Sequence, residues 1–335
     1  MFRKLSLAAL ALTVLFGCST QTPEEPKGGE MGAKKLQIAI IPKGTTHEFW
    51  KSIHAGAIKA ARELDVEVIW KGPQKEDDRE QQIQVVQGFI TSAVDGIVLA
   101  PLDAVALVKP VREATQAGIP VVIIDSDLDA EAGQDFVSLV ATDNYQGGVL
   151  GARRFGELMG GKGNAILLRY QEGSASTDRR EAGFLETIEK EFPEIKVVSS
   201  NQYAGPTTES GMQAAQRLLG QFDDVQGFYA PNESSTFGAL RALEQDGRAG
   251  KIVFVGFDSS EKLVQGMKAG EILGLTLQNP FKMGYLGVKT LVAHLSGEKV
   301  ETRIDTGAVM VTPDNMDDPE IKQVLLPDLK EYLGS

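Results

Sequence analysis

Short apolar segments alternate with segments whose apolar residues have helical spacing, and this alternation limits the possible folds more than any other feature. Residues 96–100 form one continuous apolar run, typical of a strand buried on both faces of a parallel sheet. Residues 103–117 carry valines and alanines at helical spacing and precede a glycine. Because this alternation continues from 36 to 311, we expect an α/β fold whose parallel sheets are covered by helices on both faces.

The number of predicted strands indicates more than one sheet. More than ten strands would be unusual in one open sheet, so the sequence favours two doubly wound lobes. The chain after 311 is predicted to be irregular. The predicted strands are 36–41, 66–70, 96–100, 121–124, 136–140, 164–169, 195–200, 227–230, 251–256, 272–278 and 302–311.

The first eighteen residues have the pattern of an export signal. Arg3 and Lys4 precede an apolar stretch that is too short to span a bilayer, and Leu-Phe-Gly-Cys follows. This tetrapeptide resembles a bacterial lipobox, which predicts lipid attachment at Cys18; a plain secretory signal is the alternative. Residues 19–35 are rich in Thr, Pro, Gly and Glu and are predicted to form a flexible tether. No later segment is apolar for long enough to predict a transmembrane helix.

Composition and motifs argue against several classes of function. The formal net charge is −12 and no basic patch stands out, so nucleic acid is not an expected partner. The chain has no Gly-x-Ser-x-Gly elbow, no phosphate-binding loop and no dinucleotide fingerprint after the first strand. Its three histidines lack further ligands at zinc-site spacing. We therefore expect no enzymatic activity, no cofactor and no metal.

The segment 43–50 opens the first predicted helix at the carboxyl end of the first strand. Ligands of open α/β sheets bind at that end. Gly44 allows a turn, and Thr45 or Thr46 is predicted to cap the helix. Phe49 and Trp50 begin the helix with two rings, which could pack on the apolar face of a sugar or belong to the core.

Polar residues follow most of the predicted strands, where an α/β fold places ligand groups. Asp103, Asp143 and Glu233 each begin a helix, so we predict that they cap it. Asp125 and Asp258 end strongly apolar strands and are predicted to contact a ligand. Carboxylates, amides and a guanidinium together suit an uncharged polyhydroxy compound, because each buried hydroxyl needs a partner. The remaining candidates are His47, Arg180, Tyr203, Asn232 and Gln278.

Residues 36–311 resemble the ribose/galactose-type substrate-binding proteins of bacterial ABC importers, the type I periplasmic binding proteins. No one motif is decisive, but their order and spacing together are specific. The motifs that carry the resemblance are Glu-Phe-Trp at 48–50, Val-Ile-Ile-Asp at 122–125, Ala-Thr-Asp-Asn at 141–144, Arg-Arg-Glu-Ala-Gly-Phe at 179–184, Tyr-Ala-Pro-Asn-Glu at 229–233, Val-Gly-Phe-Asp at 255–258 and Gln-Asn-Pro at 278–280.

The resemblance implies two doubly wound lobes joined by three crossovers that close on a ligand. One lobe would comprise 36–142 and 279–307, and the other 143–278 and 308–335. The ligand-binding residues implied by the resemblance are Phe49 and Trp50, His47 or Thr46, Asp125, Arg180, Tyr203, Asn232, Phe257, Asp258 and Gln278. The family's ribose binders have Arg and Asn where this chain has Ser126 and 100–101 Ala-Pro, so the resemblance does not specify ribose.

By resemblance, the chain is expected to be a monomeric, lipid-anchored extracytoplasmic receptor. It would bind a monosaccharide or polyol between its lobes and deliver it to an ABC permease in the membrane. Two alternatives remain at this stage: a sensor that presents its ligand to a chemoreceptor or histidine kinase, and an exported hydrolase.

Overall fold

A computed structural model describes residues 34–334. The predicted signal peptide with Cys18, and the predicted tether up to residue 33, lie outside the described residues. Lys35–Ser335 forms one compact unit, and its described part contains two six-stranded sheets. Within this part of the chain, no helix is both long and apolar enough to cross a membrane.

The first sheet has the strand order β11-β5-β4-β3-β1-β2, and all its pairings are parallel. Helices α1 and α9 pack together on one face, where the core includes Ile38, Trp50 and Leu291. Helices α2 and α3 cover the other face. The elements are β1 (Gln37–Ile41), α1 (Glu48–Leu64), β2 (Glu67–Trp70), α2 (Arg79–Thr91), β3 (Gly96–Leu99), α3 (Val108–Gln116), β4 (Val121–Ile124), β5 (Ser138–Ala141), α9 (Pro280–Leu295) and β11 (Arg303–Asp305).

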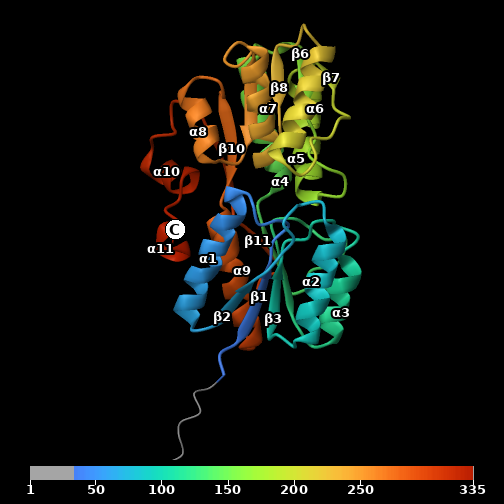
Figure 1. The fold of residues 1–335 in the computed structure, drawn as a ribbon, viewed down its shortest axis with the longest axis vertical. Coiled ribbons are helices and arrows are strands. Elements are labelled where there is room, and N and C mark those ends of the chain that lie inside the picture. The colour runs from blue at the N-terminus through green and yellow to red at the C-terminus, as the bar shows by residue number, and fades with distance from the viewer. Residues whose placement is uncertain (1–33, 335) are drawn as a thin grey trace, which may run out of the picture. The chain divides into compact units, whose positions relative to one another are not determined.

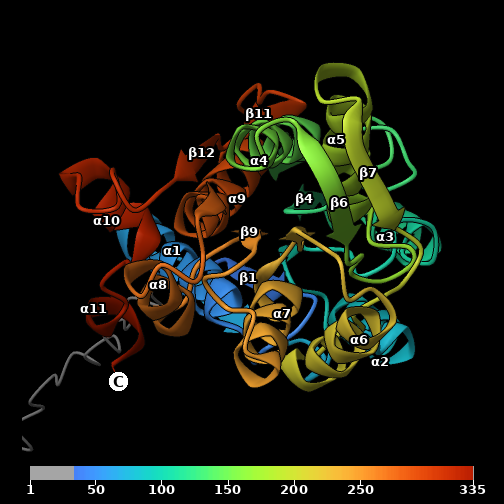
Figure 2. The same cartoon turned by 90° about the horizontal axis from the view of Figure 1, so that it is seen from above.

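The second sheet repeats this arrangement in the order β12-β10-β9-β8-β6-β7, except that β12 is antiparallel to β10. Helices α4 and α5 cover one face, and α6, α7 and α8 cover the other, as Figure 2 shows. The elements are α4 (Asn144–Leu158), β6 (Lys162–Leu167), α5 (Ala175–Glu191), β7 (Glu194–Ser199), α6 (Thr208–Gln221), β8 (Gly227–Tyr229), α7 (Glu233–Asp246), β9 (Val253–Phe257), α8 (Glu261–Lys268), β10 (Gly274–Gln278) and β12 (Ala308–Val311).

Three short segments carry the chain between the sheets: β5 to α4, β10 to α9, and β11 to β12 (Figure 1). Two of them are bonded to each other, because the Thr142 hydroxyl lies 3.2 Å from that of Thr306 and the backbone N–H of Asp143 donates to Asp305. Each sheet with its helices is called a lobe below. The first lobe contains β1–β5 and β11, and the second contains β6–β10 and β12.

The C-terminal segment contacts both lobes. Helix α10 (Pro319–Leu325) packs on the second lobe through Leu325. Helix α11 (Lys330–Leu333) lies against the first lobe, where the ring of Tyr332 is 5.4 Å from that of Phe281 and Arg62 donates to the backbone carbonyl of Glu331.

The predicted fold class is confirmed, and three local predictions are wrong. The helix predicted over 103–117 begins only at Val108, because the Asp103 carboxylate accepts from the N–H groups of Val105 and Ala106 and caps a separate turn first. The strand predicted over 302–311 is two strands that belong to different sheets. The C-terminus, predicted to be irregular, contains two short helices.

Candidate functional site

The carboxyl ends of the strands in both sheets face a small buried cavity between the lobes. Its volume is about 30 Å³, and most of its lining residues are polar or charged. A groove of about 690 Å³ adjoins it and shares His47, Phe49, Glu233, Asp258 and Gln278 with it. The first lobe lines the cavity with Lys43, His47, Phe49, Trp50, Glu76 and Asp125, and the second with Tyr170, Ser174, Ser176, Thr177, Arg180, Asn232, Glu233, Asp258 and Gln278.

An aspartate ends the fourth strand of each sheet, in the left-handed backbone region that non-glycine residues rarely adopt. Asp125 follows β4 with φ 64°, and Asp258 follows β9 with φ 65°. The backbone N–H of Asp125 donates to Val140 on β5, and that of Asp258 donates to Thr276 on β10. These bonds to the next strand fix both carboxylates at the cavity, which is consistent with strained backbone at a functional site.

In the first lobe, the charged groups are paired with each other. Lys43 Nζ lies 2.8 Å from Asp125 Oδ2. Glu76 accepts from the indole N–H of Trp50 at 2.6 Å and from Nδ1 of His47 at 2.5 Å, and its other oxygen accepts from the Tyr170 hydroxyl of the second lobe at 2.6 Å. Glu76 thus joins His47, Trp50 and Tyr170 into one network.

The pairing of His47 with Glu76 shifts both titrations. Burial lowers the pKa of His47, but the hydrogen bond and charge of Glu76, with smaller contributions from Glu233 and Asp258, outweigh burial and raise that pKa to about 9. Burial raises the pKa of Glu76, but His47, Trp50 and Tyr170 outweigh it and lower that pKa to about 2. The imidazolium and carboxylate therefore stabilise each other near neutral pH.

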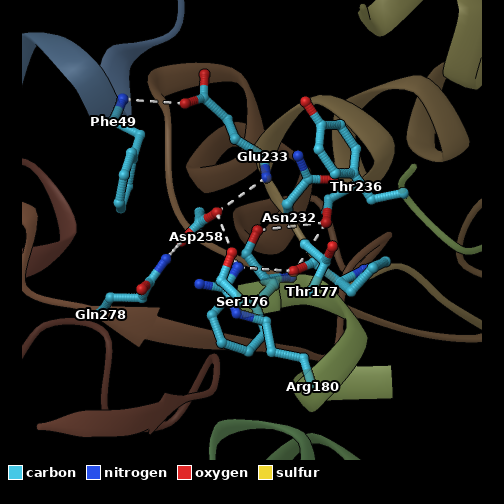
Figure 3. A network of polar contacts seen from close by, with 12 residues as sticks. Phe49, Ser176, Thr177, Arg180, Asn232, Glu233, Thr236, Asp258 and Gln278 are labelled. Carbon is cyan, nitrogen blue, oxygen red and sulfur yellow. Dashed lines mark hydrogen bonds and ion pairs between the residues drawn. The ribbon is translucent and has the colours of Figure 1, made fainter. Parts of the chain in front are cut away.

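In the second lobe, the key groups are oriented but not fully paired. Arg180 donates from Nε to Asn144 at 2.8 Å and from Nη1 to the carbonyl of Pro231 at 2.9 Å, while its guanidinium lies 4.0 Å from the centroid of the Phe257 ring. Gln278 donates to Asp258 Oδ1 at 2.7 Å. Figure 3 shows Asp258 between this amide and the backbone N–H of Glu233.

Two buried polar atoms of this set have no partner among the described residues: Nη2 of Arg180 and Oε1 of Gln278. One is a donor and the other is an acceptor. Buried polar groups normally find partners, so two orphans of opposite kind at one cavity indicate a ligand with hydroxyl groups, which both donate and accept.

Similarity to known proteins agrees with this geometry. A family model described as a periplasmic binding protein domain matches residues 38–299. The chain belongs to the periplasmic binding protein family. A D-ribose/D-allose-binding protein of Pseudomonas aeruginosa is 30% identical over 322 residues, which cover 93% of this chain and 98% of the relative.

Solved structures of this family share the fold. A carbohydrate transporter solute-binding protein of Agrobacterium radiobacter, in complex with D-arabinose, matches with a TM-score of 0.83 and 34% identity over 87% of this chain and 99% of its own. An ABC transporter solute-binding protein of Agrobacterium vitis with bound D-fucose matches with a TM-score of 0.83 and 35% identity over 86% of this chain and 99% of its own. These relatives and neighbours are sugar-binding receptors of transport systems.

The structure brings most of the predicted ligand residues of this periplasmic binding protein to one cavity, but three lie elsewhere. Thr46 is exposed in the adjoining groove. Phe257 is buried beneath Arg180 and supports it without lining the cavity. Tyr203 is 38% exposed and packs against Arg169. The predicted ligand residues that line the cavity are His47, Phe49, Trp50, Asp125, Arg180, Asn232, Asp258 and Gln278.

Of four capping predictions, one is confirmed and two are wrong, and Asp103 caps only the turn that precedes α3. Neither threonine caps α1, because His47 occupies that position without a side-chain bond. Glu233 does not cap its own helix; Asn232 does so by accepting from Ser235. Asp143 caps α4 as predicted, by accepting from the N–H of Gln146.

Sequence reasoning missed seven residues that line the cavity: Lys43, Glu76, Tyr170, Ser174, Ser176, Thr177 and Glu233, which was predicted only as a helix cap. Lys43 and Tyr170 follow strands of their sheets as closely as the predicted residues do, so the same rule could have found them. Glu76 lies in the loop after an edge strand and carries no comparable signal.

Proposed function

We propose that this protein is an extracytoplasmic receptor that binds a monosaccharide or related polyol in the cavity between its lobes and delivers it to an ABC permease. The observation that carries this proposal is the orphan pair, Nη2 of Arg180 and Oε1 of Gln278, at a cavity that also presents carboxylates and the aromatic residues Phe49, Trp50 and Tyr170. A sugar satisfies all three kinds of group, because its hydroxyls pair with the polar atoms and its C–H face packs on a ring. D-arabinose and D-fucose, the sugars of two structural neighbours, are the first candidates.

Binding requires the lobes to move apart and close again. A cavity of about 30 Å³ holds little more than one water molecule, far below the roughly 300 Å³ at which ligand pockets begin. The three crossovers are short and two are bonded to each other, so they suit a hinge between rigid lobes. Ligand binding would favour the closed form, and only that form would present both lobes correctly to the permease.

The proposal includes a lipid anchor, which is supported by the lipobox-like sequence that ends at Cys18. Attachment at Cys18 would hold a monomeric receptor near the membrane through residues 19–35. Metabolic labelling with a fatty acid tests it: label should enter the wild-type chain and be absent from Cys18→Ser.

Thermal unfolding with a panel of pentoses, hexoses, polyols and small non-sugars tests the ligand. A ligand at one hundred times its dissociation constant adds about 2.7 kcal/mol to the stability of the folded state. For a chain of this size the melting temperature should then rise by roughly 4 °C. A rise with a non-sugar alone would overturn the proposed ligand class, and no rise with any solute would overturn the receptor.

A further inference from the structure

Helix α1 begins at the cavity without a capping side chain of its own. Its N-cap residue, His47, has an extended backbone, and its side chain makes no bond to the first turn. By contrast, a first-turn backbone N–H donates to the side chain of the helix's own N-cap residue in α2, α4, α6, α7, α8 and α9. The first N–H groups of a helix have no acceptor inside the helix, so α1 needs one from elsewhere.

The acceptor comes from the other lobe. Glu233 begins α7 in the second lobe, and its Oε2 accepts from the backbone N–H of Phe49 at 3.0 Å while its Oε1 accepts from that of Glu48 at 3.3 Å. Figure 3 shows the Glu233 carboxylate reaching the backbone of Phe49. A carboxylate at this end of a helix also interacts favourably with the helix dipole.

We propose that Glu233 caps α1 across the cleft. It acts as a positioning residue that increases the population of the closed arrangement of the lobes. Both partners belong to the protein, so the contact contributes to closure with or without a bound sugar. When the lobes separate, the carboxylate leaves the helix and the two N–H groups return to water.

The same contact links closure to the ligand site. The backbone N–H of Phe49 donates to Glu233, and Phe49 also lines the cavity. The cap therefore holds the Phe49 ring where a ligand would pack. The backbone N–H of Glu233 donates to Asp258 Oδ2 at 3.0 Å, which ties the cap to a carboxylate at the cavity. Glu233 therefore acts through Phe49 and Asp258. The inference rests on the proposed function only in naming the cavity as the ligand site.

Hydrogen exchange and small-angle scattering on the full-length, sugar-free protein test the inference. Glu233→Ala should speed exchange of the amides of Glu48 and Phe49 by about fivefold, the typical effect of losing a helix cap. The same variant should shift the scattering profile towards a larger radius of gyration, because open lobes become more populated. Glu233→Gln keeps the size and one acceptor, so both shifts should be smaller.

Glu261→Gln is the matched control. Glu261 also directly follows an N-cap residue in the second lobe, but it is exposed, and α8 is capped by Ser260. Neither readout should change in this variant. Unchanged exchange at Glu48 and Phe49 in Glu233→Ala would overturn the cap, and faster exchange with unchanged scattering would overturn its role in closure. If both readouts shift but no sugar binds the wild-type protein, the role of Glu233 in closure is supported and the proposed ligand class is wrong.

Discussion

Corresponding positions of the two lobes hold an aspartate in the same backbone conformation, yet the two carboxylates have different neighbours. Asp125 of the first lobe is paired with a buried lysine, Lys43, at 2.8 Å. Asp258 of the second lobe lies 4.0 Å from Arg180 and accepts from Gln278, and both of those residues keep an unpartnered polar atom at the cavity. The first lobe thus satisfies its own charges, while the second leaves hydrogen-bonding capacity for a ligand.

This difference suggests a division of roles between the lobes. Changes to the paired groups of the first lobe should affect mainly the free energy of unfolding, because a buried charge left alone is costly. Changes in the second lobe should affect mainly ligand affinity. The following predictions test that division, beginning with the largest expected effect.

Removing the first-lobe aspartate should cost the most. Asp125→Ala leaves the Lys43 ammonium buried without its counter-charge, and breaking a buried pair in this way typically costs about 3 to 5 kcal/mol. Chemical denaturation would measure the loss. Combining Asp125→Ala with Lys43→Met removes both charges and should restore most of the stability. An unchanged denaturation midpoint in Asp125→Ala would contradict the structural role of this pair.

The His47–Glu76 pair of the first lobe should make stability fall at alkaline pH. The pKa of His47 is about 9 in the folded protein against 6.5 for an ordinary histidine, so its contribution is complete below pH 6.5 and is lost as the pH rises through 9. The shift corresponds to a loss on the order of 3 kcal/mol. Denaturation at several pH values should show this slope in the wild-type protein and a flatter profile in His47→Gln.

His54 provides the control for that profile. Its ring stacks on Trp70, and burial lowers its pKa. Because a lowered histidine pKa destabilises the fold as the pH falls, His54→Gln should leave the alkaline slope unchanged. An equal flattening in both histidine variants would show that the slope does not come from the pairing with Glu76.

Removing the second-lobe aspartate should reduce binding more than stability. Asp258→Ala removes a counter-charge 4.0 Å from Arg180, a looser pair than the 2.8 Å pair of the first lobe, and Arg180 keeps its bonds to Asn144 and Pro231. A ligand that hydrogen-bonds to this carboxylate should bind about 10- to 100-fold more weakly, as expected for a bond of roughly 1.5 to 3 kcal/mol to a charged group. Titration calorimetry with the sugar identified by thermal unfolding measures the loss. If Asp258→Ala unfolds as readily as Asp125→Ala, the division between the lobes fails.

The fold could be predicted from the sequence because its signals are local. Apolar runs and helical periodicity located the strands of both sheets, except that β11 and β12 were predicted as one strand. These patterns depend only on neighbouring residues. The two short C-terminal helices carry no strong pattern, since α11 is only four residues long and owes its place to contacts with α1 and α9. The cap of α1 could not be predicted either, because Glu233 lies 184 positions away in the sequence and no local signal connects the two.

The sequence could predict which polar residues follow a strand, but not which of those strands lie inside the sheet. Tyr203 and Tyr170 both follow strands of the second sheet, but β7 is its edge strand and β6 lies inside it. Tyr170, after the inner strand β6, reaches the cavity, and Tyr203, after the edge strand β7, lies at the surface. Sheet order is a tertiary property, so the sequence could not distinguish the two tyrosines.

These two tyrosines also give the smallest predicted effect. The Tyr170 hydroxyl donates to Glu76 across the cleft at 2.6 Å, and Tyr170→Phe removes that bond while keeping the buried ring. Ligand affinity should fall by about five- to tenfold, in line with roughly 1 kcal/mol for one hydrogen bond. Tyr203→Phe removes the same hydroxyl from a residue outside the cavity and should leave the affinity unchanged. Equal losses in both variants would mean that Tyr203 also reaches the ligand. A loss confined to Tyr170→Phe would show that the contact of Tyr170 with Glu76 between the lobes contributes to binding.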